Sequence, residues 1–209
     1  FTVNAIALDE AQGQLVDPYE GQKDIKDKLL RAVGTPRERF AEDALRMLRA
    51  VRLVAELGFG IDGATAEAVQ ENALNLKHVS RERVRDELVR ILESKQPMDA
   101  LILAQQLGIL VYIAPDLTRG IGVDQNQAHS YDVFGHLMRT MQHAADKGFG
   151  FDVTLAGLFH DVSKPETRRW SEEKKDWTFH GQEVVGSRVT KKALTGLKFS
   201  RETVEKVSN

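Results

Sequence analysis

Cysteine is absent from this chain of 209 residues. Disulfide bridges and thiolate metal sites are therefore excluded, so a metal site would have to use imidazole and oxygen ligands. Long apolar runs are absent too. No stretch of about 18 apolar residues predicts a membrane helix, and the first residues lack the basic-then-apolar pattern of a signal peptide. We expect a cytoplasmic protein without membrane contact.

The chain also has little net charge, with a formal value of −2. It therefore has no bulk attraction for nucleic acid, and any contact with RNA must come from local basic clusters. Apolar residues make up 42% of the sequence and charged residues 29%, a composition that can bury a real core. The chain opens at Phe1 without a methionine and stops at Asn209 inside a helical pattern, so we expect a fragment of a longer protein.

The most informative stretch runs from Glu42 to Gly58, and its pattern predicts one helix with acids in its first turn and a glycine cap at its end. Apolar side chains repeat at a helical period on one face: Ala44, Met47, Leu48, Val51, Val54 and Ala55. Three arginines lie on the opposite face: Arg46, Arg49 and Arg52. Asp43 and Arg46 are three residues apart, so we expect their side chains to meet over one turn. The simplest alternative is a surface helix with solvated charges.

The rest of the chain predicts a mainly α-helical fold, with a small β hairpin at the N-terminus only. Residues 1–8 are β-compatible, and Leu15 and Val16 follow a turn at Gly13. Helices are expected over residues 22–33, 64–74, 81–93 and 98–107, the second capped by Asp62 and the third by Ser80. The polar residues 118–129 are the best candidate for a linker.

Four short motifs follow one another in the first 88 residues. They are Phe1-Thr2-Val3-Asn4-Ala5, Asp17-Pro18-Tyr19-Glu20-Gly21, Glu42-Asp43-Ala44-Leu45-Arg46 and Arg83-Val84-Arg85-Asp86-Glu87. Their order and spacing resemble those of the bacterial-type (class II) tRNA nucleotidyltransferases, the CCA-adding enzymes and their poly(A) polymerase relatives. That family adds C, C and A to the 3′ end of tRNA from CTP and ATP without a nucleic-acid template.

The resemblance implies a role for several side chains. The nucleotide-binding residues would be Asp43, Arg46, Arg49, Arg52 and Asn4, with Asn4 lining the sugar and Arg49 and Arg52 holding the triphosphate or bracing the base-reading pair. Arg83 and Glu87 would brace the neck helices. The family holds its two Mg²⁺ ions on carboxylates of a head that lies upstream of Phe1, so this part would recognise nucleotides and tRNA without catalysing transfer.

The edges of the bases explain how a protein can select CTP and ATP. Cytosine and adenine each present an exocyclic amine beside an unprotonated ring nitrogen. The carboxylate of Asp43 can accept from the amine, and the guanidinium of Arg46 can donate to the ring nitrogen. Uracil and guanine present a carbonyl and a ring N–H instead, which mismatches both groups at a cost of roughly 1–3 kcal/mol each.

A second signature appears after residue 130. His136 opens one helix and the doublet His160-Asp161 closes another, so three ligands that suit a divalent metal ion can converge. These phrases resemble the HD superfamily of metal-dependent phosphohydrolases. Gln182 stands where the family phrase usually has histidine, and His180 is a candidate substitute. The final aspartate of the superfamily has no convincing match before Asn209.

We therefore expect four segments. Residues 1–30 would end the nucleotidyltransferase head, 31–93 would form the neck with nucleotide- and RNA-binding helices, 94–129 a connector, and 130–209 a truncated HD-type domain. Expected partners are tRNA, CTP and ATP. The sequence leaves open the oligomeric state and three alternatives: an A-adding enzyme or poly(A) polymerase, a phosphohydrolase that works through the HD region, and a non-catalytic RNA-binding module.

Overall fold

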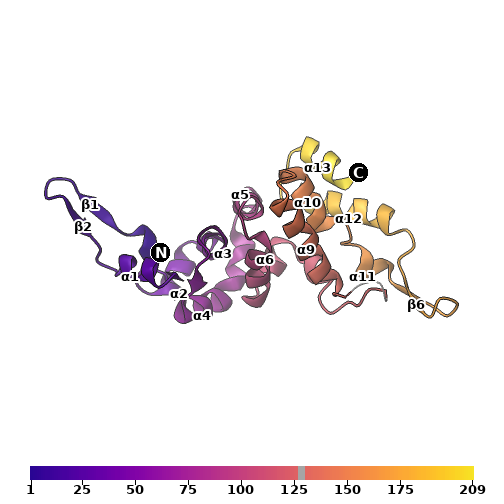
Figure 1. The fold of residues 1–209 in the computed structure, drawn as a ribbon, viewed down its shortest axis with the longest axis horizontal. Coiled ribbons are helices and arrows are strands. Elements are labelled where there is room, and N and C mark those ends of the chain that lie inside the picture. The colour runs from indigo at the N-terminus through magenta and orange to yellow at the C-terminus, as the bar shows by residue number, and fades with distance from the viewer. Residues whose placement is uncertain (127–129) are drawn as a thin grey trace.

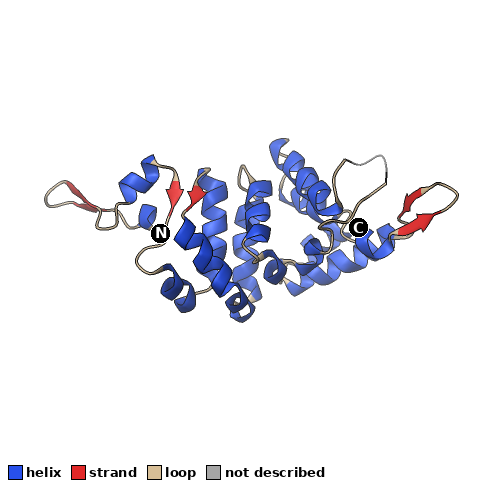
Figure 2. Ribbon diagram, turned by 90° about the horizontal axis from the view of Figure 1, so that it is seen from below, coloured by secondary structure: helices blue, strands red, loops and turns tan. Residues whose placement is uncertain are grey.

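The computed structural model describes residues 1–126 and 130–209 as an elongated molecule with a β hairpin at either end and helices between them (Figures 1 and 2). This confirms the mainly α-helical fold. The described helices are η1 Thr2–Asn4, α1 Gly21–Lys26, α2 Pro36–Glu42, α3 Leu45–Leu57, α4 Gly63–Asn72, η2 Ala73–His78, α5 Arg81–Leu92, α6 Pro97–Gln106, α7 Leu110–Ile113, α8 Pro115–Thr118, α9 Val133–Asp146, α10 Phe151–Phe159, α11 Lys164–Thr167, α12 Gln182–Gly196 and α13 Arg201–Ser208. The described strands are β1 Ala7–Asp9, β2 Gln14–Val16, β3 Leu29–Leu30, β4 Gly60–Ile61, β5 Arg169–Ser171 and β6 Asp176–Thr178. Among the described helices, none is both long and apolar enough to span a membrane.

The N-terminal region corrects two predictions. Residues 2–4 form the 3-10 turn η1 in place of a strand, and the hairpin itself pairs β1 with β2. The predicted helix over residues 22–33 ends at Lys26. Lys28 takes a left-handed backbone conformation (φ 53°), which stops the helix, and β3 then pairs in parallel with β4. Ile25 at the end of α1 is 46% exposed, whereas Leu30 of β3 is completely buried.

The predicted helix over residues 42–58 is two helices, α2 and α3, joined by a turn. Asp43 ends α2 with an extended backbone (φ −149°, ψ 101°), and its Oδ1 accepts the Leu45 N–H at 3.1 Å. An aspartate that bonds a nearby backbone N–H in this way favours a helix start over a helix interior. The prediction that Asp43 lies in the first turn of the arginine-bearing helix is therefore wrong. Gly58 does end α3 in a left-handed conformation, as predicted.

The apolar face of α3 packs into the core. Met47, Leu48 and Val51 are completely or almost completely buried, and α3 packs against both α5 and α6. Val54 is only half-buried and joins a smaller cluster with Leu30. Because this face is fixed in the core, the opposite face of α3 presents its arginines in a defined direction.

The helices after α3 begin close to where the sequence predicts. The side chain of Asp62 accepts the Thr65 N–H at 3.1 Å and so caps α4, as predicted. Ser80 precedes α5 at the expected position, although its side chain makes no capping hydrogen bond there.

One apolar core continues from the helices around α3 into the C-terminal helices and includes residues from Ala32 to Val204. The described part of the predicted linker is bonded to the start of α9: the Gly120 carbonyl accepts the Phe134 N–H, and the Val123 carbonyl accepts the N–H of residue 133. A side chain at Gly120 would come within 2.9 Å of the Phe134 nitrogen, so glycine permits this close approach. Residues 127–129 of the predicted linker lie outside the described residues.

A second hairpin, β5–β6, contradicts the prediction of a hairpin at the N-terminus only. Trp170 and Trp177 are paired across the two strands, and Lys175 takes a left-handed conformation (φ 48°) in the connecting loop. Cross-strand aromatic pairs stabilise a short hairpin. The contact between the two tryptophans therefore favours strand pairing here, although the residues between them are mostly charged.

Candidate nucleotide and metal sites

Asp43 lies at the turn between α2 and α3, where Arg83 of α5 holds it. The Arg83 Nη2 donates to Asp43 Oδ2 at 2.8 Å, while Oδ1 accepts the Leu45 N–H. Burial alone raises the pKa of Asp43, but the hydrogen bond from Arg83 and that from Leu45 outweigh it, so the pKa lies below its usual range. The side chain is 28% exposed. Asp43 is therefore an anionic acceptor, fixed in place and still reachable from solvent.

Arg46 extends from the first turn of α3 and bonds the end of α2 rather than Asp43. Its Nη1 donates to Glu42 Oε2 at 2.7 Å and to the Arg39 carbonyl at 3.1 Å. The predicted side-chain pair of Asp43 with Arg46 is thus replaced by two separate ion pairs, because the turn at Asp43 removes the shared helix. Both bonds use Nη1, so the Nη2 and Nε donors take no part in them. The residues around this guanidinium form a cavity of about 240 Å³ lined by Phe1, Val33, Arg39 and Arg46.

Arg49 and Arg52, on the same face of α3, both contact Glu87 of α5. Arg49 Nε donates to Oε1 at 3.1 Å, and Arg52 Nε lies 2.8 Å from Oε2 at an angle unsuited to a hydrogen bond. Arg52 also donates to Glu56 at 3.1 Å. The Glu87 side chain is only 6% exposed, so this carboxylate is compensated by two guanidinium groups. Arg83 and Glu87 were expected to share one face of α5. Arg83 pairs with Asp43, just before α3, and Glu87 contacts Arg49 and Arg52 on α3.

The two N-terminal motifs meet at the start of α1. Asp17 accepts the N–H groups of Gly21 and Gln22 at 2.7 and 2.8 Å, which satisfies two free donors of the helix. A side chain at Gly21 would overlap the Thr2 carbonyl oxygen, so the Asp-x-x-x-Gly spacing has a steric reason. Asn4, the proposed sugar contact, ends η1 with an exposed side chain.

An ion pair with a buried aspartate, which sequence analysis missed, connects this region to β3 and α4. Asp24, 3% exposed, accepts the Thr2 hydroxyl at 2.7 Å and pairs with Arg31 at 3.2 Å. The same arginine lies 3.0 Å from Asp62, the cap of α4. Nothing in the local pattern brings residues 24, 31 and 62 together, because their contact depends on the β3–β4 pairing.

The three predicted metal ligands do converge. The Nε2 atoms of His136 and His160 lie 2.9 Å apart, and each lies 3.1 Å from Asp161 Oδ2. His160 Nδ1 lies 2.9 Å from the Gly157 carbonyl and donates to it when protonated, which leaves Nε2 free to bind a metal ion. Two imidazoles and one carboxylate with their ligand atoms within 4.8 Å of one another fit a borderline divalent ion.

A lysine that the sequence analysis did not single out completes this cluster. Lys164 is 6% exposed, and its Nζ lies 2.7 Å from Asp161 Oδ2 and 2.6 Å from Gln125 Oε1. Burial raises the pKa of Asp161, but the hydrogen bonds from His160 and Lys164 hold it far below its usual range. Burial lowers the pKa of His160, and its interaction with Asp161 outweighs this and raises it. The i+3 spacing from the His-Asp doublet was the signal available in the sequence.

The departure at Gln182 has a structural counterpart. Its backbone carbonyl accepts the Ser163 hydroxyl at 2.7 Å, while its buried Oε1 has no hydrogen-bond partner. His180, the candidate substitute, has an exposed side chain and is not among the three residues that converge as possible metal ligands in the described part of the chain.

Comparison with known proteins supports the order of these elements. Residues 1–31 match the poly A polymerase head domain, residues 58–121 match the probable RNA and SrmB-binding site of polymerase A, and residues 133–209 match the HD domain. An A-adding tRNA nucleotidyltransferase from Deinococcus radiodurans is 36% identical over 215 aligned residues, 100% of this chain and 49% of that protein. The chain belongs to the tRNA nucleotidyltransferase and poly(A) polymerase family. The family predicted from the four motifs is thereby confirmed.

Other members of the family extend the comparison. A CC-adding tRNA nucleotidyltransferase from Thermus thermophilus is 34% identical over 197 residues, 90% of this chain and 45% of that protein. The crystal structure of the Bacillus stearothermophilus CCA-adding enzyme in complex with CTP superposes with a TM-score of 0.56 at 26% identity, over 99% of this chain and 56% of that one. The chain spans about half the length of the Deinococcus radiodurans and Thermus thermophilus proteins.

Proposed function

We propose that this chain supplies nucleotide recognition and tRNA contact in a nucleotidyltransferase that extends the 3′ end of tRNA with C, C and A from CTP and ATP. The observation that carries the proposal is the placement of a fixed acceptor, Asp43, and a donor, Arg46, at the two ends of one turn. Arg46 lines a cavity of about 240 Å³, slightly smaller than a typical small-molecule site, as expected for one wall of a cleft.

The hydrogen-bonding state of both side chains suits base reading. Asp43 carries two engaged oxygens, but a carboxylate accepts about four hydrogen bonds, so it can also take the exocyclic amine of cytosine or adenine. Arg46 bonds the end of α2 through Nη1 alone, and its other donors can reach the unprotonated ring nitrogen. The ion pairs to Glu42 and Arg83 hold the two groups in place before the nucleotide binds, which lowers the ordering cost of binding.

The remaining residues divide between bracing and phosphate contact. Arg52 pairs with Glu87 and Glu56 and is 15% exposed, which favours the bracing role. Arg49 is 49% exposed, so it can still contact a triphosphate. Asn4 is proposed as the contact to the sugar. Transfer itself requires two divalent ions, proposed as Mg²⁺, on carboxylates in the rest of the protein.

The similar proteins differ in the nucleotides that their names say they add, so they support nucleotide addition without fixing which nucleotides are added. Those similar to this chain include A-adding, CC-adding and CCA-adding enzymes, and the last of these has been solved with CTP. Addition of A alone is therefore the nearest alternative to CCA addition. Because one acceptor–donor pair fits both cytosine and adenine, the pair separates these two bases from uracil and guanine rather than from each other.

The test restores the upstream head and measures incorporation of all four nucleotides. Arg46→Ala should relax the preference for CTP and ATP over UTP and GTP. The control is Arg90→Ala, which removes an exposed arginine of α5 outside the proposed site. Equal selectivity in both variants and the parent would refute the base-reading role.

The HD region carries a second candidate activity, metal-dependent hydrolysis of a phosphate ester. The convergence of His136, His160 and Asp161 favours it. A divalent ion held by these three residues would activate water and polarise a phosphoryl group. Lys164 fixes the Asp161 carboxylate, and the Gly157 carbonyl orients the His160 ring.

A further inference from the structure

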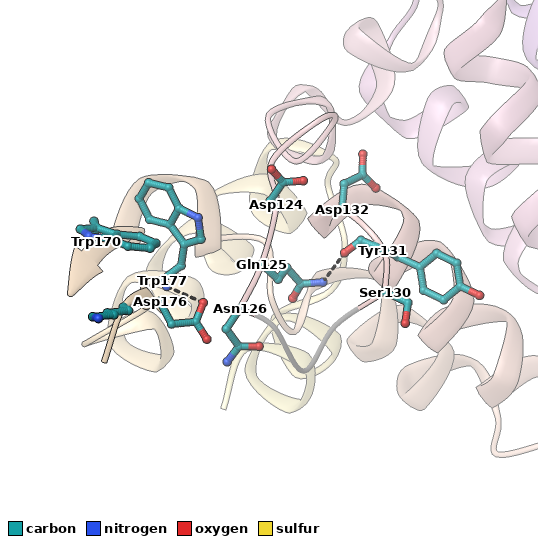
Figure 3. A pocket seen from close by; sticks show the side chains of 10 residues that line it. Asp124, Gln125, Asn126, Ser130, Tyr131, Asp132, Trp170, Asp176 and Trp177 are labelled. Carbon is teal, nitrogen blue, oxygen red and sulfur yellow. Dashed lines mark hydrogen bonds between the residues drawn. The ribbon is translucent and has the colours of Figure 1, made fainter. Parts of the chain in front are cut away.

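A pocket of about 360 Å³ lies between the β5–β6 hairpin and the segment that leads into α9 (Figure 3). It is remote from the Arg46 cavity, since this hairpin and α2–α3 lie in opposite halves of the molecule (Figure 1). Its described lining residues are Asp124, Gln125, Asn126, Ser130, Tyr131, Asp132, Trp170, Lys175, Asp176 and Trp177. Neither the base-reading pair nor the three metal ligands belong to this set.

One wall of the pocket is aromatic. The rings of Trp170 and Trp177 meet edge to face, with centroids 5.3 Å apart and planes at 75°. The Arg168 guanidinium lies over the Trp177 ring, 3.6 Å from its centroid. Trp170 is 48% exposed, so much of a large aromatic surface faces solvent. Planar aromatic groups stack on such a surface, and unpaired nucleobases do so irrespective of their identity.

The opposite wall is rich in acceptors and negatively charged. Two aspartates of this wall, Asp124 and Asp132, line the pocket; the third lining aspartate, Asp176, and the one described basic lining residue, Lys175, lie in the hairpin. Asp132 accepts the N–H groups of Gly122 and Gly135 at 2.7 Å each, and Asp176 accepts the Trp177 N–H at 2.7 Å, so Asp124 is the carboxylate that we expect a ligand to meet. A ligand here should offer N–H donors and should carry little phosphate close by.

The pocket is joined to the metal-ligand cluster through one side chain. Gln125, 5% exposed, donates to the Tyr131 carbonyl at 3.1 Å (Figure 3) and accepts from Lys164 at 2.6 Å. Lys164 in turn pairs with Asp161 at 2.7 Å. The pocket is therefore connected to the cluster through the hydrogen bonds of Gln125 and Lys164.

We propose that this pocket binds an unpaired nucleobase that carries an exocyclic amine, stacked on Trp170 with its amine toward the acidic wall. Adenine, cytosine and guanine have this amine, and uracil lacks it. The negative wall disfavours a triphosphate, so the base belongs to a free nucleoside or to the 3′-terminal nucleoside of a single-stranded RNA. The proposal does not depend on the Arg46 site, which contains no tryptophan.

Tryptophan fluorescence tests the proposal without a label, because the chain contains two tryptophans and both line this pocket. The 209-residue chain is titrated with adenosine, uridine and ATP. We expect saturable quenching by adenosine, with weaker binding of uridine and of ATP. A short oligoadenylate with a 3′-hydroxyl distinguishes the two sources. Tighter binding of the oligonucleotide than of adenosine assigns the pocket to an RNA end, and equal binding assigns it to a free nucleoside.

Three variants and a control test how the base binds at this pocket. Trp170→Ala should weaken adenosine binding about tenfold, whereas Trp170→Phe should retain most of it. Asp124→Asn should narrow the gap between ATP and adenosine. Phe149→Ala, which removes an aromatic side chain that is 57% exposed elsewhere, should bind like the parent. No saturable quenching by adenosine in the folded parent, or equal quenching in Trp170→Ala, would overturn the proposal. A response to spermidine without one to adenosine would also overturn it and assign the pocket to organic cations.

Discussion

Arg83 on α5 donates to Asp43 at 2.8 Å and so connects two motifs that lie 40 positions apart in the sequence. The contact crosses from α5 to the turn that precedes α3, and it orients the carboxylate proposed to read the base. Arg83 therefore acts on nucleotide choice through Asp43 and need not contact the nucleotide itself.

Removal of this contact should affect selectivity more than stability. Arg83→Ala leaves Asp43 bonded only to the Leu45 N–H, so the carboxylate can rotate away from the base. With side chains 49% and 28% exposed, the ion pair should contribute under about 1 kcal/mol to folding. In the head-restored enzyme, discrimination of CTP against UTP should fall while the unfolding midpoint barely moves. Unchanged discrimination with a large loss of stability would give Arg83 a purely structural role.

Glu87 should behave in the opposite way, because it is a buried carboxylate between two arginines. Glu87→Gln leaves Arg52, whose side chain is 15% exposed, without its buried counter-charge. We expect the free energy of unfolding to fall by about 3 kcal/mol, measured by urea denaturation. Glu56→Gln removes the more exposed partner of the same arginine and should change stability by under about 1 kcal/mol. Equal effects of the two substitutions would contradict the bracing role of Glu87.

Base selectivity should not depend on pH near neutrality. The pKa of Asp43 is lowered from its ordinary value, so the folded protein keeps the carboxylate charged, and arginine stays protonated. A lowered folded-state pKa stabilises the protein above the unfolded pKa, and this contribution is lost as the pH falls through the folded value. The ratio of CTP to UTP incorporation should therefore be constant between about pH 5 and pH 8. A midpoint within that range would implicate a histidine instead.

The HD cluster should hold one divalent ion per chain after chelation and reloading. His160→Ala removes a ligand whose Nε2 lies 3.1 Å from Asp161 Oδ2, so metal content should drop to background. His143→Ala removes an exposed histidine from α9, the helix that carries His136, and should retain the ion. Metal analysis of the two variants decides this, and equal metal in both would show that His160 is not a ligand.

The local sequence pattern was sufficient to predict the buried face of α3 and the ends of two helices. The buried face of α3, the Gly58 cap and the Asp62 cap all follow from spacing and side-chain chemistry. The resemblance to the HD superfamily singled out His136, His160 and Asp161, whose side chains the structure brings together. The turn at Asp43 was missed because an aspartate fits both a helix start and the first turn of a longer helix.

Other features depend on contacts between distant residues, which one sequence does not reveal. The partners of Glu87 lie on another helix, and Gln125 reaches Lys164 across 39 positions. The β5–β6 hairpin rests on a single pair of tryptophans that border a strongly charged loop, so its alternating pattern is too short to predict a strand.

The most direct test of base reading is a double-mutant cycle on selectivity in the head-restored enzyme. Asp43→Asn, Arg46→Ala and the double variant are compared by the ratio of kcat/KM for CTP to that for UTP. Because both side chains would read one base, each single variant should lower the ratio about tenfold or more, and the double variant should lose less than the product of the two. A ratio equal to that of the parent in all three variants would contradict the account.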